Sequence, residues 1–377
     1  MHSPFMYGKV VAGETFIDRE DEQKRLSNNV ASHINSILIS PRRWGKSSLV
    51  ARVGQTLQQR NPALRFCFLD LFNVRSEEEF YAQLAKEVLR VSFSKWEERV
   101  ESAKRFFKRL TPKFTFGIDP LNDFSVSFDW EEVRKSSEEI LNLPERASKE
   151  KKIQIVVCLD EFQNIGYFED PLGFQKRLRA HWQRHSLATY CLYGSKRHLM
   201  AELFEQKSMP LYKFGDVVFL EKIPEEYWVP FITAAFKNTG KHISNDLAFR
   251  IAREMENHPY FVQQLAHTVW NTTKKNCTSR EYKGSIDELL TQHTILFQRE
   301  VDGLTNPQVN FLKALCDDVP QFSAAETLRK YKLGTSGNVN RIKTSLVNKE
   351  VIDITPQETE FVDPLFKLWF STFYMKR

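Results

Sequence analysis

Apolar and polar positions follow one pattern over residues 1–222 and a different one beyond them. In the first part, short apolar runs end in polar residues, which is typical of strands buried on both faces of a parallel sheet. Segments with helical spacing separate these runs, so the pattern predicts an α/β fold with right-handed crossovers. The runs expected to form strands are residues 36–39, 64–69, 153–159, 188–195 and 217–220.

Residues 95–150 interrupt this pattern. Two alternating runs, at 114–118 and 124–128, lie on either side of a polar turn at 119–123. Alternation on both sides of such a turn predicts a β-hairpin. We expect this segment to be an insertion beside the sheet, which either presents a surface to a partner or packs over a helix.

From residue 223 the pattern indicates helices only, and it predicts a compact helical domain over residues 223–303. Proline in the first turn and serine at the N-cap are the usual signals of a helix start. The expected helices begin near Pro224, Ser244, Pro259 and Ser285.

Residues 304–377 change pattern again. Helices are expected at 306–316, from Ser323 and at 338–349, and a hairpin at 351–362. This order is that of a winged helix-turn-helix domain. Such a domain either reads double-stranded DNA, with its third helix in the major groove and its wing on backbone phosphates, or binds a protein partner. The candidate DNA-binding residues are Asn340, Arg341, Lys343, Thr344 and Asn348.

The clearest candidate chemistry lies between the first expected strand and the helix after it. Residues 40–48 match the phosphate-binding loop G-x-x-x-x-G-K-[ST], except that Ser40 replaces the first glycine. The N–H groups of such a loop form an anion site, where Lys46 would reach the β- and γ-phosphates and Ser47 would ligate Mg²⁺. The candidate nucleotide-binding residues are Ser40, Pro41, Arg42, Arg43, Trp44, Gly45, Lys46, Ser47 and Ser48.

Two acids follow the expected strand at 153–159. Ligands of open α/β sheets bind at the carboxyl ends of strands, so Asp160 and Glu161 lie where a bound nucleotide would be. We expect Asp160 to hold Mg²⁺ together with Ser47, and Glu161 to orient and polarise an attacking water. The predicted cofactors are therefore ATP and Mg²⁺.

Composition narrows the class of protein. Hydrophobic residues make up 41% of the chain and charged residues 27%, an ordinary globular balance. No apolar run approaches the roughly 20 residues of a membrane span, and no signal-peptide pattern is present, so a cytoplasmic protein without a membrane partner is expected. The five cysteines have neither metal-ligand nor disulfide spacing. The net charge of +6 is compatible with a polyanionic partner without requiring one.

With these residues in view, the chain resembles the AAA+ ATPases, and among them prokaryotic ATPases close to the origin-recognition-type and STAND branches. The resemblance covers most of the chain and is weakest at residues 95–150. It rests on residues 16–22 (Phe-Ile-Asp-Arg-Glu-Asp-Glu), 41–49, 160–163 (Asp-Glu-Phe-Gln), 193–200, 209–212 and 363–369.

The resemblance implies further roles. Residues 7–11 would approach adenine, and Ser195 would be a sensor that touches the γ-phosphate or the water. Pro259 lies where the helical lid of such proteins carries a Gly-x-Pro contact to the nucleotide, with Asn257 in place of the glycine.

The resemblance also implies an arginine finger and self-association into a homo-oligomer. The family often has an arginine directly after Tyr212, but this chain has Lys213 there. Arg184, late in the helix after the two acids, is the other candidate. A finger supplied in trans typically contributes about 10³–10⁵ in rate, so its absence would predict slow turnover.

Together these observations predict an ATP-hydrolysing molecular switch whose nucleotide state controls DNA or protein binding through the winged helix. The expected catalytic residues are Lys46, Glu161 and Ser195. The alternative is a nucleotide-locked adaptor or DNA-binding regulator with negligible turnover, which Ser40, Asn257 and the missing finger favour. A small-molecule kinase is a weaker third interpretation, because the C-terminal half offers no obvious acceptor site.

Overall fold

The computed structural model describes residues 2–9, 17, 19–93, 96–110, 113–116, 124–355 and 358–376. The chain divides into two compact units. One is Arg19–Glu221, and the other combines Met1–Asp18 with Lys222–Arg377. The N-terminal segment thus groups with the C-terminal half rather than with the sheet, because Phe5 packs against the rings of Phe231 and Phe236.

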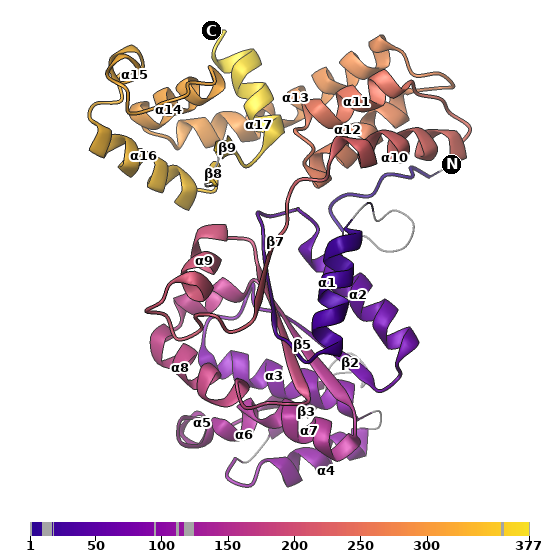
Figure 1. Ribbon diagram of the computed structural model, residues 1–377, viewed down its shortest axis with the longest axis vertical. Coiled ribbons are helices and arrows are strands. Elements are labelled where there is room, and N and C mark those ends of the chain that lie inside the picture. Colours follow the sequence, from indigo (N-terminus) through magenta and orange to yellow (C-terminus); the bar gives the residue numbers. More distant parts are fainter. Residues whose placement is uncertain are drawn as a thin grey trace. The chain divides into compact units, whose positions relative to one another are not determined.

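Within the described residues, the first unit contains a five-stranded parallel sheet in the order β2-β5-β6-β1-β7 (Figure 1). The prediction of a parallel α/β sheet is confirmed, with strand bounds shifted by one residue at most. In this order β6 lies between β1 and β5, so all three carboxyl ends meet at one edge. The strands are β1 Ser36–Ile39, β2 Leu64–Asp70, β5 Gln154–Asp160, β6 Ala188–Gly194 and β7 Asp216–Phe219.

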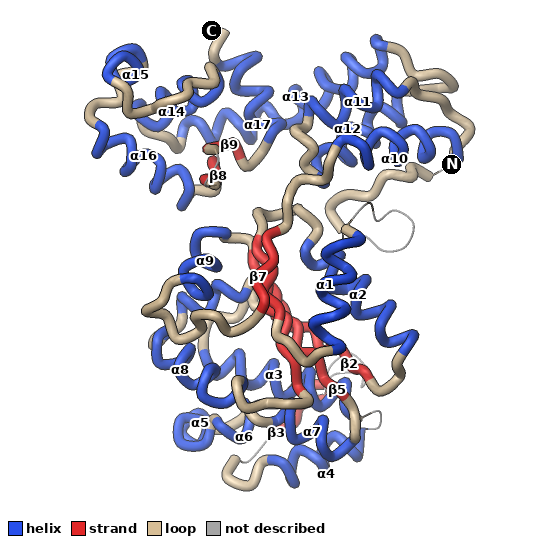
Figure 2. Tube along the Cα trace, in the orientation of Figure 1, coloured by secondary structure: helices blue, strands red, loops and turns tan. Residues whose placement is uncertain are grey.

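Helices cover both faces of this sheet (Figure 2). Nearly every position of β1, β5 and β6 is buried, which explains their continuous apolar runs. The helices of this unit are α1 Glu20–Ala31, α2 Lys46–Arg60, α3 Glu77–Ser92, α4 Trp96–Phe106, α5 Trp130–Ser136, α6 Glu138–Leu141, α7 Leu143–Lys151, η2 Phe162–Tyr167, α8 Pro171–Trp182 and α9 Arg197–Glu205.

The insertion forms the hairpin that its alternation predicts. Strands β3 (Lys113–Phe116) and β4 (Phe124–Ser127) pair antiparallel, and the expected turn lies outside the described residues. Val126 and Phe128 are buried in the main core, and Phe128 packs edge-on against Phe107. β4 also lies against α3. The hairpin therefore packs over a helix, which was one of the two expected roles of the insertion.

Glu145 fixes the start of β6, the strand that leads to Ser195. It is 5% exposed, and its carboxylate accepts hydrogen bonds from the N–H groups of Leu187 (2.9 Å) and Ala188 (3.0 Å). Burial by itself raises the pKa of Glu145, but the N–H groups of Ala188 and Leu187 outweigh it and hold this pKa at about 2. The ionised carboxylate therefore stabilises the fold.

Replacing Glu145 with glutamine should cost about 1–2 kcal/mol of unfolding free energy at pH 7, after allowance for solvent screening. Because the folded-state pKa lies below the ordinary value of 4.5, the stabilisation is present above that pH and is lost as pH falls toward 2. Urea unfolding of both proteins at pH 7 and at lower pH measures this. Glu150→Gln, on the same helix but in an exposed ion pair, is the control. A difference that does not shrink on acidification would contradict the assignment.

The second unit begins with four helices around one core. Three of the four expected helix starts are confirmed, and the one at Ser285 is wrong. That serine is buried inside α13, which begins earlier because Thr278 and Glu281 form a capping box. The helices are α10 Glu225–Asn238, α11 Asn245–Glu254, α12 Pro259–Thr272 and α13 Ser279–Asp302.

The winged-helix arrangement follows, as predicted, with two helix starts misplaced. The second helix begins at Ala325, since Ala324 and not Ser323 is its N-cap. The third begins at Ser336, two residues early, because the Thr335 side chain caps it by accepting from the N–H of Asn338. The elements are α14 Asn306–Cys316, α15 Ala325–Lys330, α16 Ser336–Asn348, β8 Ile352–Ile354, β9 Thr359–Phe361 and α17 Pro364–Trp369.

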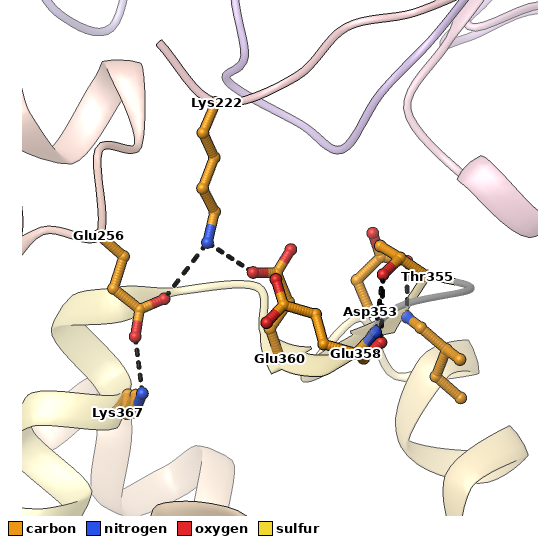
Figure 3. Close-up of polar contacts among 8 residues, drawn as sticks. Lys222, Glu256, Asp353, Thr355, Glu358, Glu360 and Lys367 are labelled. Carbon is orange, nitrogen blue, oxygen red and sulfur yellow. Dashed lines mark hydrogen bonds and ion pairs between the residues drawn. The ribbon is translucent and has the colours of Figure 1, made fainter. Parts of the chain in front are cut away.

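Charged side chains join the helical part of this unit to its winged helix (Figure 3). Lys222 forms ion pairs with Glu360 on β9 and with Glu256, at 3.6 Å, just after α11. Glu256 in turn accepts from Lys367 on α17 at 2.7 Å. Lys222 and Glu256 therefore link the helical part of this unit to its winged helix.

Candidate functional site

The lysine of the loop between β1 and α2 donates hydrogen bonds back to the start of that loop. Lys46, the first residue of α2, is 5% exposed, and its Nζ donates to the carbonyl oxygens of Ser40 (2.8 Å) and Pro41 (2.9 Å). Burial lowers its pKa to about 8. Gly45 has φ 90°, a conformation that favours glycine, and open space lies where its Cβ would be. The loop thus presents the N-terminus of α2 and a buried cation, as an anion site requires.

The loop accommodates Ser40 in place of the first glycine of the motif. The backbone at Ser40 is not in the left-handed region, so a side chain is accommodated there. The Ser40 hydroxyl lies inside the loop, 3.3 Å from the Lys46 Nζ. Ser48 and Trp44 are also buried, and the Arg197 guanidinium lies 5.8 Å from a Trp44 ring centroid. Arg42 and Arg43 are exposed.

Ser47 and Asp160 meet across the sheet edge, as predicted. The Ser47 hydroxyl donates to Asp160 Oδ2 at 2.5 Å, and Asp160 Oδ1 accepts from the N–H of Glu161 at 2.8 Å. Burial raises the pKa of Asp160, which the bond from Ser47 partly offsets. A hydroxyl and a carboxylate oxygen this close are the hard donors that Mg²⁺ prefers. These two residues therefore fit the predicted ion.

Glu161 and Ser195 are also brought together. The Ser195 hydroxyl donates to Glu161 Oε2 at 2.7 Å, and the Arg42 Nε reaches Ser195 at 3.4 Å. Gln163 donates to the same Glu161 oxygen. Gln163 was not among the residues predicted from the sequence, although it closes the Asp-Glu-Phe-Gln segment on which the resemblance partly rests. All three expected catalytic residues thus lie at one edge of the sheet.

The two candidates for the arginine finger lie elsewhere. Arg184 is exposed after α8, and its backbone N–H donates to the carbonyl of His181. Lys213 is exposed too, with its ammonium 5.5 Å from its neighbour's ring. In the described part of the chain, no hydrogen bond or ion pair joins either side chain to residues 40–48. A finger from either residue would have to act from another copy of the chain.

The backbone conformation at Asn257 explains why asparagine can replace the glycine of the Gly-x-Pro segment. Asn257 has φ 60°, and asparagine is among the few residues that tolerate this left-handed conformation. Pro259 opens α12, where the side chain of His258 accepts from the N–H of Tyr260. Tyr7 packs on the ring of Tyr260. Of the segment expected to approach adenine, residues 10–11 lie outside the described residues.

The third helix of the winged helix exposes fewer charges than expected. Asn340, Arg341, Thr344 and Asn348 are exposed on α16. Lys343, by contrast, turns inward: its Nζ lies 4.9 Å from the ring centroid of Phe322 and donates to Thr359. A contact of Lys343 with DNA stays a prediction, and its ammonium is already engaged by Phe322 and by Thr359 of the wing.

The wing itself is acidic. Asp353, Glu358 and Glu360 lie along the hairpin, where Lys222 forms an ion pair with Glu360 (Figure 3). Lys343 of α16 donates to Thr359 on the same hairpin. Negative side chains oppose a phosphate backbone, whose neutralisation by lysine and arginine drives most non-specific DNA affinity. This hairpin lacks the charge that the expected phosphate contacts would need.

Two family models match the chain. Residues 12–175 match the model described as a predicted AAA-ATPase, and residues 295–372 match the one described as a probable winged helix domain. No curated protein sequence matches it. In the part of the chain that the structure describes, no helix is both long and apolar enough to cross a membrane.

Solved structures share the fold over almost the whole chain. The chain is similar to a Walker-type ATPase of Pyrococcus abyssi, with a TM-score of 0.66, 16% identity and coverage of 95% of this chain and 97% of that one. It is also similar to the ORC2 protein of Aeropyrum pernix, solved in ADPNP–ADP complexes, with a TM-score of 0.56, 13% identity and 97% coverage of both chains. Identities this low establish the shared fold alone.

Proposed function

We propose that the chain is an AAA+-type P-loop protein with a C-terminal winged helix, which hydrolyses Mg²⁺–ATP slowly and acts as a switch. Nucleotide would bind at residues 40–48 and would change how the winged helix engages a partner. The observation that carries this proposal is the convergence at one sheet edge of Lys46, the pair Ser47–Asp160 and the pair Glu161–Ser195.

Each of these groups has a task in phosphoryl transfer. Lys46 would exchange its loop carbonyls for phosphate oxygens, and Ser47 and Asp160 would hold Mg²⁺, which neutralises charge on the phosphates when bound. Glu161 would orient the attacking water and take up its proton, while Ser195 fixes the carboxylate. Because phosphoryl transfer depends mainly on positioning and charge stabilisation, this set is sufficient for slow hydrolysis.

A nucleotide-locked adaptor is the second candidate. The exposed positions of Arg184 and Lys213 favour it, because neither supplies a positive charge to the site of its own chain. If the chain forms homo-oligomers, another copy would bring one of these residues to the nucleotide. Turnover should then rise steeply with protein concentration, whereas an adaptor would stay inactive.

A protein is the partner that we propose for the winged helix, with duplex DNA second. The inward position of Lys343 and the acidic wing leave Arg341 as the exposed cation on α16. A protein surface tolerates this charge pattern, while duplex DNA would meet repulsion at the wing.

Steady-state ATP hydrolysis with and without duplex DNA, with Lys46→Ala as the blank, tests the proposal. Turnover above the blank that DNA leaves unchanged is the expected result. Stimulation by DNA would restore the DNA-coupled alternative. Tight ATP binding without turnover above the blank would establish the adaptor.

Duplex DNA should bind weakly and with a shallow salt dependence. A protein that makes 6–10 phosphate contacts loses about 10³–10⁵ in affinity between 50 and 200 mM salt, and we expect a loss below about tenfold here. Fluorescence anisotropy of a labelled duplex measures this for the wild type, for Arg341→Ala and for the control Lys274→Ala, an exposed lysine outside the winged helix. A steep salt slope that Arg341→Ala alone reduces would show that α16 reads DNA.

A further inference from the structure

Gln163 is a buried polar residue directly behind the two acids. It is 2% exposed and lies in η2, which begins right after Glu161. Its Nε2 donates to Glu161 Oε2, while its Oε1 is buried without a hydrogen-bond partner among the described residues. A buried polar atom without a partner costs free energy, so a residue kept in this state calls for an explanation.

The explanation lies in the carboxylate that it contacts. Glu161 Oε2 receives two hydrogen bonds, from the Gln163 amide and from the Ser195 hydroxyl at 2.7 Å. The backbone of Glu161 has φ 51°, so the residue already occupies a conformation that few side chains favour. Two donors on one oxygen hold the carboxylate in one orientation and leave its Oε1 for another partner.

Gly194, the last residue of β6, makes room for the amide. A Cβ at this position would lie 2.0 Å from Gln163 Oε1 and 2.7 Å from the Met200 sulfur. Its backbone is not in the left-handed region, so close approach and not conformational freedom is what requires glycine. Gly194 and Ser195 thus act on Glu161 together, one by leaving space for Gln163 and the other by donating directly.

We propose that Gln163 is the positioning residue of the hydrolytic centre. Its amide holds the Glu161 carboxylate in the orientation needed to direct a water at the phosphate, and the missing side chain of Gly194 leaves room for this amide. The inference rests on the proposed hydrolysis at this site. It assigns Gln163 no contact with nucleotide or water, so its loss should change the rate of the chemical step and leave ATP binding intact.

The matched variants are Gln163→Met and Gln175→Met. Methionine keeps the length and volume of glutamine but cannot donate to Glu161. Gln175, on α8, is also 2% exposed with an unpartnered buried Oε1, but it lies outside the site, so its variant reports the effect of the same change on packing alone. The measurements are kcat, KM, ATP affinity by fluorescence titration and the thermal midpoint without nucleotide.

Wild-type turnover above the Lys46→Ala blank is established first, so that failure of the proposed function is recognised separately. Gln163→Met should then lower kcat about 10–100-fold, the effect of a misplaced catalytic group, with KM and ATP affinity within about threefold. Its thermal midpoint should match that of Gln175→Met. Unchanged kcat, or a kcat loss that accompanies a lower midpoint and weaker ATP binding, would overturn the proposal while leaving the ATPase assignment in place.

Gly194→Ala gives an independent check, because it displaces the same amide without changing it. It should lower kcat as Gln163→Met does, and the double variant should lose no more than either single one, since both remove one interaction. Fully multiplicative losses would show that Gly194 and Gln163 act separately and would overturn the link between them.

Discussion

Replacing Lys46 with alanine is expected to weaken ATP binding more than 100-fold and to abolish hydrolysis. The ammonium is buried in the loop and would be the cation facing the β- and γ-phosphates, and loss of one partner from a buried charged pair costs about 2–5 kcal/mol. Fluorescence titration with a labelled ATP analogue and steady-state hydrolysis measure the two effects. Lys176→Ala, an exposed lysine on α8, is the control.

The same variant should fold normally. Burial lowers the pKa of Lys46, which means that the folded chain without nucleotide bears a cost for keeping this group charged. The thermal midpoint of the nucleotide-free variant should therefore equal or exceed that of the wild type. If ATP affinity survives the substitution, the nucleotide binds elsewhere and residues 40–48 are not its binding site.

Replacing Glu161 with glutamine should separate binding from hydrolysis. We expect kcat to fall about 10²–10⁴-fold, because the amide cannot accept the proton of the attacking water, while ATP affinity stays within about threefold. The amide is nearly isosteric, so the Ser195 hydroxyl still finds an acceptor at this position. The variant should accumulate in the ATP-bound state, and its affinity for a partner should shift to that of the ATP form.

Glu169→Gln, an exposed acid shortly after η2, is the matched control for this experiment. Single-turnover measurements with radiolabelled ATP distinguish slow chemistry from slow product release. A variant that hydrolyses ATP at the wild-type rate would exclude Glu161 as the base. If neither protein turns over ATP and partner binding is the same for both, the nucleotide-locked adaptor becomes the better description.

Local patterns in the sequence were enough to predict the nucleotide core and the order of its elements. A buried strand, a Gly-Lys-Ser segment and a helix start are adjacent in the chain, so their physical signals do not depend on distant residues. The same holds for the capped helices of the second half. Two starts were misplaced because another side chain supplies the cap, Thr278 for α13 and Thr335 for α16, and a third because Ala324, which has no capping side chain, precedes α15. The order of the winged-helix elements could be predicted because these signals are local.

Side-chain direction and long-range contacts were decided only by the tertiary structure. Lys343 appeared available from its helical position, but the rings of Phe311 and Phe322 and the hydroxyl of Thr359 draw its ammonium inward. Phe5 docks on α10, more than 200 residues away, because it completes the core of that unit.

The role that we propose for Gln163 likewise became visible only in three dimensions. Its amide meets Glu161 beside a glycine that ends a different strand, so the relevant space is enclosed by segments distant in the chain. The sequence by itself determined which local elements form and which chemical groups the loop and the acids provide. Packing decided which of those groups face one another, because contacts between distant segments depend on how the whole chain fills its interior.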